Sequence, residues 1–460
     1  MRTVFKYLLL VLPIFSLAQG GDDSIFIRRI YDEELQRGQA YARLRSLCKD
    51  VGHRLSGSPG AEKAVIWGLE QMREMGYDTA WLQPMWVPRW ERGDIERLEM
   101  VVDGRTKSLR ITTLGMSIPT SGVLSAKVMA VRNYHELETL GKSAVEGKIV
   151  FFHEPMDPRF IDTFGAYSTC GTYRLRGASR AAALGAVAVI VRSLTLQTDD
   201  HPHTGTVIYA DSLPQIPAVA VATADADVLL KECRRTSNLS LKLMLNCRQY
   251  ADVISYNVVG EMYGRDRNTF ITVGGHLDSW DKGEGAHDDG AGVVHSMEAL
   301  RLLKTLGYSP NYTLRCVLFM NEENGTRGGN AYADSTSKDQ TRHYAAIESD
   351  RGGFSPRGFS MDVSPLQMEH LQKLTPLLKP YLLHLFYQGW SGVDIAPLRR
   401  RHPSAMLLGF VTDSQRYFDF HHADTDVFEA VNQRELELGA AGMAAMVYLI
   451  DKYPLPAERE

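Results

Sequence analysis

The segment TFITVGGHLDSWDKGEGAHDDGAGVVHSMEALRLLKTLG, residues 269–307, contains a strand pattern, a polar loop and a helix pattern in succession. Residues 270–273 form an apolar, mostly β-branched run of the kind that fills a buried strand. Apolar residues then recur at helical spacing from Val293 to Leu303, and Gly307 ends that pattern as a helix C-cap would. Because strands alternate with amphipathic helices, we predict an α/β fold with a mixed, mostly parallel sheet that is covered by helices on both faces.

Three more predicted strands follow in this half of the chain, and polar side chains come soon after each one. The runs are residues 313–320, 344–347 and 404–410. In an open α/β sheet, ligands bind outside the carboxyl ends of the strands. We therefore expect one pocket to collect the polar groups that follow the four strands. They are His276, Asp288, Glu322, Glu323, Asp350 and His422.

Four carboxylates and two imidazoles in one partly buried pocket predict a metal site. Without cations, the carboxylates would repel one another and take up protons. Imidazole and carboxylate without thiolate suit a catalytic zinc, with cobalt and manganese as weaker candidates. A carboxylate can also bridge two metals about 3.5–4 Å apart, and such a pair can activate water and polarise a carbonyl group. Taken singly, each group has a simpler role, since Asp288 or Asp289 at the start of a helix could be only an N-cap.

The chain before residue 252 divides into a helical part and a β-rich part. Residues 25–47 and 59–75 show helical spacing of apolar residues. Between residues 117 and 251, short β-rich runs surround one Ala-rich helix at 173–184. The β-rich runs are residues 148–152, 187–191 and 216–221. This stretch is predicted to be a separate module.

The N-terminus and the charge restrict the location and the partners of the protein. Residues 1–18 combine a basic start, an apolar run and small residues, which is typical of a secretory signal peptide and predicts a secreted or periplasmic protein. The apolar run is too short for a membrane helix, and no later stretch is long and uncharged enough, so no membrane span is expected. The 51 Lys and Arg residues against 55 Asp and Glu residues give a net charge of −4, which offers no basis for binding nucleic acid.

Several common kinds of site are missing from the sequence. It has no G-x-S-x-G, H-E-x-x-H or P-loop motif, which excludes the usual serine-hydrolase, zincin and nucleotide-binding sites. The five cysteines are scattered, and an odd count leaves at least one thiol unpaired. Trp390 and Tyr417 are candidates for the pocket wall, but as large aromatic residues they are expected in the core instead.

The segments that carry the six polar groups resemble the metal-binding segments of the M28 co-catalytic zinc peptidases. These segments are GGHLDSWDKGEGAHDDGAG (274–292), NEENG (321–325), ESD (348–350) and FHH (420–422), the last followed by Asp426. Upstream, RLSGSPGAEKA (54–64), PRWERG (88–93) and TLGMSIPT (113–120) resemble the carboxypeptidase Q branch of that family. The β-rich module is similar to the protease-associated domain that is inserted in this branch.

The resemblance implies the zinc exopeptidase fold and a division of the chain. Residues 1–18 would be the signal peptide, and residues 19–116 the first part of the peptidase domain. Residues 117–251 would be the protease-associated insertion, and residues 252–460 the catalytic part. It further implies a secreted enzyme that hydrolyses dipeptides or short peptides, with two Zn²⁺ per chain, and a homodimer.

The resemblance also assigns the metal ligands. His276 and Asp350 would hold one zinc, Glu323 and His422 the other, and Asp288 would bridge the two.

The remaining roles implied by the resemblance are catalytic. Glu322 would be the general base that takes a proton from the metal-held water, so that a metal-bridging hydroxide attacks, and passes that proton to the leaving amine. Asp278 would orient the imidazole of His276, as ligating histidines usually require.

Some alternatives stay open at this point. His421 could replace His422 as a ligand, although Asp426 lies four residues after His422 and matches the spacing of the family. An M28 aminopeptidase could have the same metal core, because the two exopeptidase directions differ in which substrate terminus the walls of the site recognise. The fold also occurs in glutaminyl cyclase, a single-zinc acyltransferase. It occurs as well in the transferrin receptor ectodomain, which binds a partner and is not a peptidase; if this chain were such a binding protein, some of the metal ligands should be missing from its sequence.

Overall fold

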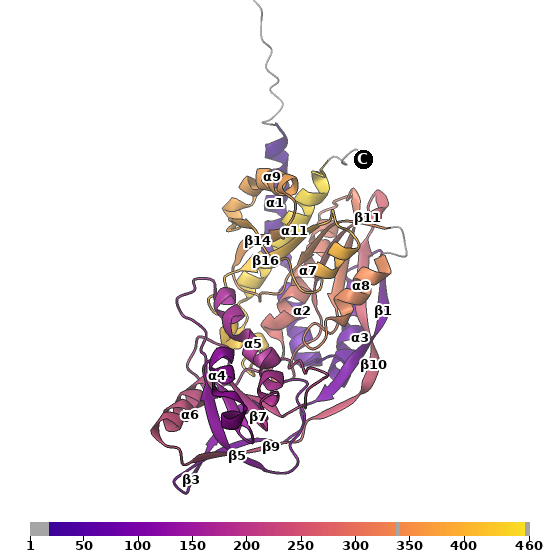
Figure 1. Ribbon diagram of the computed structural model, residues 1–460. Helices are drawn as coiled ribbons and strands as arrows, with labels where there is room; N and C mark the ends of the chain where they lie inside the picture. Colours follow the sequence, from indigo (N-terminus) through magenta and orange to yellow (C-terminus); the bar gives the residue numbers. More distant parts are fainter. Residues whose placement is uncertain (1–17, 337–340, 456–460) are drawn as a thin grey trace, which may run out of the picture.

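The structure, a computed structural model, describes residues 18–336 and 341–455, which contain two eight-stranded sheets with separate hydrophobic cores (Figure 1). The predicted signal peptide lies outside the described residues except for Ala18. Among the described residues, no helix has the length and apolarity that crossing a membrane requires. All five cysteines have free thiols.

The first sheet is mixed, and its central strands are parallel. Its strand order is β1-β10-β12-β11-β13-β16-β14-β15. The strands are β1 (Thr79–Glu91), β10 (Arg248–Met262), β11 (Asp266–His276), β12 (Tyr312–Phe319), β13 (Arg342–Glu348), β14 (Pro356–Asp362), β15 (Leu385–Gln388) and β16 (Met406–Thr412). The four central strands β12, β11, β13 and β16 run parallel, whereas β10 and β14 pair antiparallel with them on either side. The predicted mixed α/β class is confirmed.

Helices cover both faces of this sheet, because the side chains of each buried strand alternate between two cores. Val258 and Leu318 belong to the larger core, which α1, α3, α7 and α11 complete. Val259 and Val317, their neighbours in the strands, belong to a smaller core with α8 and the short helix η5. Strands that are buried on both faces read as continuous apolar runs, which is why the sequence showed them.

The helices of this part are α1 (Ala18–Arg37), α2 (Ala40–Ser46), α3 (Pro59–Glu74), α7 (Ala291–Thr305), α8 (Arg327–Thr336), α9 (Pro365–Leu374), α10 (Tyr417–Phe420) and α11 (Gln433–Lys452). Short helical turns are η1 (Leu47–Val51), η2 (Ala286–Gly290), η3 (Thr375–Leu377), η4 (Lys379–Tyr381), η5 (Ala396–Arg400) and η6 (Phe428–Ala430). The helical spacing seen over residues 25–47 belongs to two α-helices, since the helix is interrupted at Gly38 and Gln39.

The second sheet has the order β3-β2-β9-β5-β6-β7-β8-β4. Its strands are β2 (Glu96–Val102), β3 (Arg105–Leu109), β4 (Ile111–Thr113), β5 (Leu124–Val131), β6 (Ile149–Phe152), β7 (Ala188–Arg192), β8 (Ala218–Val221) and β9 (Leu239–Leu245). Three helices pack on it, α4 (Tyr134–Val145), α5 (Thr163–Ala182) and α6 (Thr223–Arg235), where the sequence predicted one. The sheet begins at Glu96, and the proposed module boundaries at residues 117 and 251 stay a prediction.

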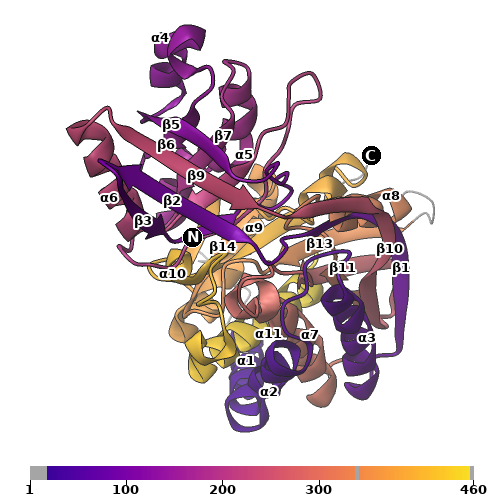
Figure 2. The same ribbon diagram turned by 90° about the horizontal axis from the view of Figure 1, so that it is seen from below.

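Two short crossings join the sheets. The chain passes from β1 to β2 between Glu91 and Glu96, and returns from β9 to β10 between Leu245 and Arg248, as Figure 2 shows where β9 runs on toward β10. Arg92 in the first crossing is 7% exposed. Its guanidinium donates to Asp281 Oδ2 at 2.9 Å, Thr112 Oγ1 at 2.9 Å and Thr204 Oγ1 at 3.3 Å. Arg92 therefore ties a loop of the first sheet to two segments of the second.

Arg54, in the loop before α3, holds the segment between β11 and η2. Its side chain is completely buried. It donates to three backbone carbonyls, Leu277 O at 2.6 Å, Glu284 O at 2.6 Å and Gly285 O at 2.9 Å. Because buried carbonyl groups need donors, this one side chain fixes the path of a loop that has no regular structure.

We expect Arg54→Met to lower the free energy of unfolding by at least about 3 kcal/mol, since three buried carbonyls lose charged donors. Arg45→Met, at an exposed position of α2, should change it by less than about 0.5 kcal/mol. Urea denaturation of both variants measures the difference. A loss below about 1 kcal/mol for Arg54→Met would show that the loop does not depend on this side chain.

Candidate metal centre

The six polar groups that follow the predicted strands lie together at the carboxyl end of the parallel strands. His276 ends β11, Glu322 and Glu323 follow β12, and Asp350 follows β13. His422 lies just beyond α10, in the connection that follows β16. A cavity of about 920 Å³ opens here. It is lined by residues from the segments that form the first sheet and from those that form the second sheet. The predicted convergence is therefore seen in the structure.

Asp288 lies between two groups of side chains. His276 Nε2 is 3.0 Å from Asp288 Oδ1 and 3.5 Å from Asp350 Oδ1. On the other side, His422 Nε2 is 3.2 Å from Asp288 Oδ2 and 3.1 Å from Glu323 Oε2. Each group contains one imidazole and one carboxylate besides the shared Asp288. This arrangement offers two neighbouring sets of ligand atoms with one carboxylate in common.

The donor set fits two divalent cations. Asp288 Oδ2 is buried, and within the described part of the chain it accepts no hydrogen bond of good geometry. A buried carboxylate oxygen of this kind is costly unless a cation or a donor satisfies it. Nitrogen and carboxylate oxygen ligands without sulfur are those of a catalytic zinc site.

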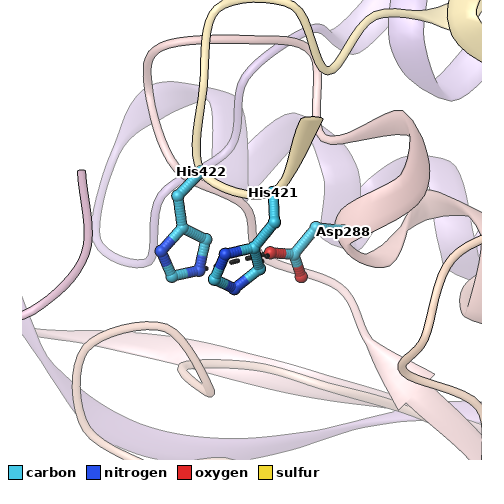
Figure 3. A group of neighbouring side chains, drawn as sticks. All are labelled: Asp288, His421 and His422. Atoms are coloured by element: carbon cyan, nitrogen blue, oxygen red, sulfur yellow. Dashed lines mark ion pairs between the residues drawn. The ribbon is translucent and has the colours of Figure 1, made fainter. Parts of the chain in front are cut away.

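His421 lies beside these ligands and is the alternative that the sequence left open. Figure 3 shows Asp288 facing both histidines, whose rings stack with centroids 3.5 Å apart. His421 Nε2 is 3.6 Å from Asp288 Oδ2, whereas His422 Nε2 is closer to Asp288 and also contacts Glu323. The geometry favours His422 as the ligand.

The electrostatics of the cluster show how strongly its charges interact. Burial alone would lower the pKa of His422, but Glu323 and Asp288 raise it to about 9. Burial raises the pKa of Glu323 to about 7, and the nearby Asp288 carboxylate adds to the effect. Burial would raise the pKa of Asp288, yet His276 and His422 lower it well below its ordinary value. Without metal, the histidines act as the counterions of the carboxylates, so metal binding would release protons.

Asp289 does not point into the cluster but supports it from behind. Its carboxylate accepts from the backbone N–H of His276 at 3.0 Å and of Gly292 at 2.9 Å. A Cβ at Gly275 or Gly292 would lie 2.4 Å from that carboxylate, so both positions need glycine. Asp289 therefore bonds the first turn of α7 although the N-cap position itself is Gly290, and Asp288 makes no such bond.

Asp278 organises two segments of the site. Its backbone carbonyl lies 3.0 Å from His276 Nδ1, whereas its carboxylate is 3.9 Å from that nitrogen. The carboxylate instead accepts from the backbone N–H groups of Asn321 at 2.7 Å and Glu322 at 3.1 Å. Asp278 therefore orients the imidazole of His276 through its main chain and holds the Glu322 turn through its side chain.

Asp426 plays a similar part for the bridging residue. Its two carboxylate oxygens accept from the backbone N–H groups of His287 at 2.7 Å and Asp288 at 3.1 Å. The sequence marked Asp426 only by its spacing from His422. In the structure it connects the segment after β16 to the segment that carries Asp288.

Arg174 on α5 is a residue of the site that the sequence did not reveal. It lines the cavity, is 7% exposed, and forms no ion pair with any described residue. Its Nη1 lies 3.3 Å from His422 Nδ1, and its buried Nε has no hydrogen-bond acceptor in the described part of the chain. A buried arginine without a counterion is rare. The anionic partner is therefore expected to be a ligand.

Aromatic side chains line the cavity near these groups. Trp390, which the sequence predicted in the core, is 61% exposed and lies at the cavity wall, so that prediction was wrong. Tyr417 is 2% exposed and packs in a cluster with Phe164 and Phe418, as expected. The two residues differ in their sequence neighbours, since Tyr417 adjoins Phe418 whereas Trp390 lies between a glycine and a serine.

Comparisons with known proteins identify the family of the chain. The profile of peptidase family M28 matches residues 257–447. Carboxypeptidase Q of Xenopus laevis is 35% identical over 418 residues, which cover 90% of this chain and 86% of that protein. Carboxypeptidase Q of Bos taurus is 33% identical over 440 residues, covering 94% of this chain and 90% of that protein.

Solved structures share the fold. A peptidase M28 precursor from Shewanella amazonensis SB2B superposes with a TM-score of 0.90 and 28% identity, covering 96% of this chain and 99% of that one. A zinc aminopeptidase from Bacillus subtilis has a TM-score of 0.63 and 18% identity, covering 89% of this chain and 94% of that one. The identity and coverage of the sequence relatives show that the chain belongs to peptidase family M28, in its carboxypeptidase Q branch, and is a metallo-exopeptidase.

Proposed function

We propose that this protein is a secreted carboxypeptidase or dipeptidase that hydrolyses dipeptides and short peptides with two Zn²⁺ per chain. Arg174 supports cleavage at the carboxyl end of the substrate. It is a buried guanidinium without a counterion among the described residues, and it lies beside the candidate metal site. A free substrate carboxylate is the natural partner of an arginine fork. The carboxypeptidase Q relatives support the same direction.

His276 and Asp350 would hold one zinc, Glu323 and His422 the other, and Asp288 would bridge them. The contacts of 3.0–3.5 Å that now join these side chains support the grouping, because each pair of ligands already faces a common point. Bound zinc ions supply a water of lowered pKa and polarise the scissile carbonyl. The zinc aminopeptidase with the same fold is consistent with this choice of metal.

Glu322 is the proposed general base. It lies next to Glu323, lines the cavity, and its backbone N–H donates to Asp278 at 3.1 Å. Burial raises the pKa of Glu322 well above its ordinary value, and the carboxylates of Asp350 and Glu323 act in the same direction. A carboxylate of raised pKa can take a proton from the attacking water and return it to the leaving amine.

Arg174 would hold the carboxylate at the end of the substrate. His422 Nδ1 has two neighbours, Arg174 Nη1 at 3.3 Å and the carbonyl oxygen of Thr204 at 3.2 Å. An imidazole that binds metal through Nε2 carries its proton on Nδ1, so it donates to Thr204 and cannot accept from Arg174. The guanidinium, which also contacts Tyr167, then uses no donor on His422.

Residues 117–251 are the proposed protease-associated module, inserted between peptidase segments 19–116 and 252–460. The second sheet contains the strands of this module and also β2, β3 and β4, which come from the end of the first peptidase segment. Residues 1–18 are the proposed signal peptide, which directs the protein to the secretory or periplasmic side. A homodimer is the expected assembly.

Glu322→Gln should retain two metals per chain but lower kcat by at least about 10³-fold, because it removes only the base. The measurements are elemental analysis and dipeptide hydrolysis. Glu70→Gln, an exposed change on α3, serves as the control and should behave as wild type. If Glu322→Gln keeps more than about a tenth of the wild-type rate, another group is the base.

Asp288→Ala should deplete both metals and lower the melting temperature, since metal binding stabilises the folded state. Chelator treatment of the wild-type protein should lower the melting temperature in the same direction. Asp424→Ala changes an exposed carboxylate two residues from His422 and should bind both metals normally. Full metal content in Asp288→Ala would contradict the bridging role.

Arg174→Met should lower kcat/KM for free dipeptides by at least about 30-fold, which corresponds to about 2 kcal/mol for a lost buried charge pair. Substrates with an amidated carboxyl end should be poor for the wild-type enzyme and little changed by the variant. Arg176→Met, an exposed position on the same helix, is the matched control. If blocking the amino end abolishes hydrolysis and amidation does not, the enzyme is an aminopeptidase instead.

A further inference from the structure

The loop between β7 and β8 crosses from the second sheet to the candidate metal centre. Thr204 donates its backbone N–H to the carbonyl oxygen of His422 at 2.9 Å. His203 Nδ1 lies 2.7 Å from the carbonyl oxygen of His421. Both loop residues are buried, with exposed fractions of 0% and 2%. Two consecutive carbonyl groups of the ligand segment are thus held by a part of the chain more than 200 residues away.

The same loop also faces the side chain of His422. The carbonyl oxygen of Thr204 is 3.2 Å from His422 Nδ1. The second proposed histidine ligand, His276, has the corresponding contact with the carbonyl oxygen of Asp278, two residues along its own loop. One imidazole is therefore oriented locally, and the other is oriented by the second sheet's part of the chain.

The ligand segment needs this support, because its backbone is unusual. His422 has a φ of +64°, a left-handed conformation that a residue with a Cβ adopts only at a cost of about 1–2 kcal/mol. The hydrogen bonds from His203 and Thr204 act on the two carbonyls around that residue. His203 is itself fixed, since its backbone N–H donates to Ser193 Oγ at 2.9 Å.

We infer that His203 is a positioning residue for the metal site: the His203–Thr204 loop holds the His421–His422 segment so that His422 Nε2 faces Asp288 and Glu323. The inference rests on the proposed function, in which His422 and Glu323 hold one zinc while His276 and Asp350 hold the other. The segments that form the second sheet would therefore complete the metal site of His422 and Glu323, but not the site of His276 and Asp350. Loss of the His203 contact should therefore weaken one metal selectively.

The test uses the full-length protein, stripped of metal and titrated with zinc. His203→Leu removes the donor at similar volume, and His203→Asn keeps an amide N–H close to the position of Nδ1. His201→Ala is the matched control in the same loop, because its exposed contact with Asp424 at 2.7 Å joins the same two segments. Bound zinc is measured by calorimetry and by elemental analysis after dialysis at fixed free zinc, with circular dichroism to confirm the fold.

Wild type, His203→Asn and His201→Ala should each bind two equivalents with affinities within about threefold of one another. His203→Leu should bind one equivalent normally and the second at least about 10-fold more weakly, and high zinc should restore its peptidase activity. Normal binding of both metals by His203→Leu, or equal weakening of both, would overturn the inference.

If His203→Leu does not fold, His203→Ala decides the question, because it also removes the donor to the carbonyl oxygen of His421. Weakening of one equivalent by at least about 10-fold would support the inference, and normal binding of both equivalents would overturn it. Failure of the proposed function gives a different result. In that case the wild-type protein itself binds fewer than two equivalents.

Discussion

The site depends on one buried carboxylate, Asp288, which two histidines approach from opposite sides at 3.0 and 3.2 Å. A buried carboxylate is stable in its charged form only beside positive charges. Asp288 and the histidines provide this for each other, because their attraction raises the pKa of His422 and lowers the pKa of Asp288. The rest of the local structure keeps Asp288 in place. Asp426 accepts from its backbone N–H, and Arg54 fixes the loop that leads to it.

The protein builds this site from two sheets with different tasks. The first sheet brings the charged groups together, because its central strands are parallel and all end on one side. The second sheet's part of the chain contributes Arg174 to the cavity and packs the His203–Thr204 loop on the ligand segment. The two parts are joined by two crossings and by Arg92, so their relative position matters for the proposed substrate contact and for one of the two proposed metal sites.

Much of the architecture could be predicted from the sequence where the strands are buried on both faces. Continuous apolar runs such as residues 316–320 are typical of central strands in a parallel sheet, and the polar groups behind them therefore lie at one edge. The helices α4 and α6 were missed, since their apolar faces are narrow and their neighbours are short strands. Trp390 was predicted in the core but lies exposed at the cavity wall. The position of a cavity wall follows from the folded chain and produces no local pattern in the sequence.

The α/β class, the set of six polar groups and the family that they resemble follow from the amino-acid sequence alone, because they depend on the order of strands and on the residues just after them. Which atoms face each other depends on the folded chain. In the structure, Asp288 faces the histidines, whereas Asp289 does not. Arg174 lacks a counterion among the described residues and contacts His422, which also contacts the carbonyl oxygen of Thr204. Those contacts join residues up to 248 positions apart in the chain. Long-range pairings of this kind are produced by the packing of two sheets and leave no periodic signal in the sequence.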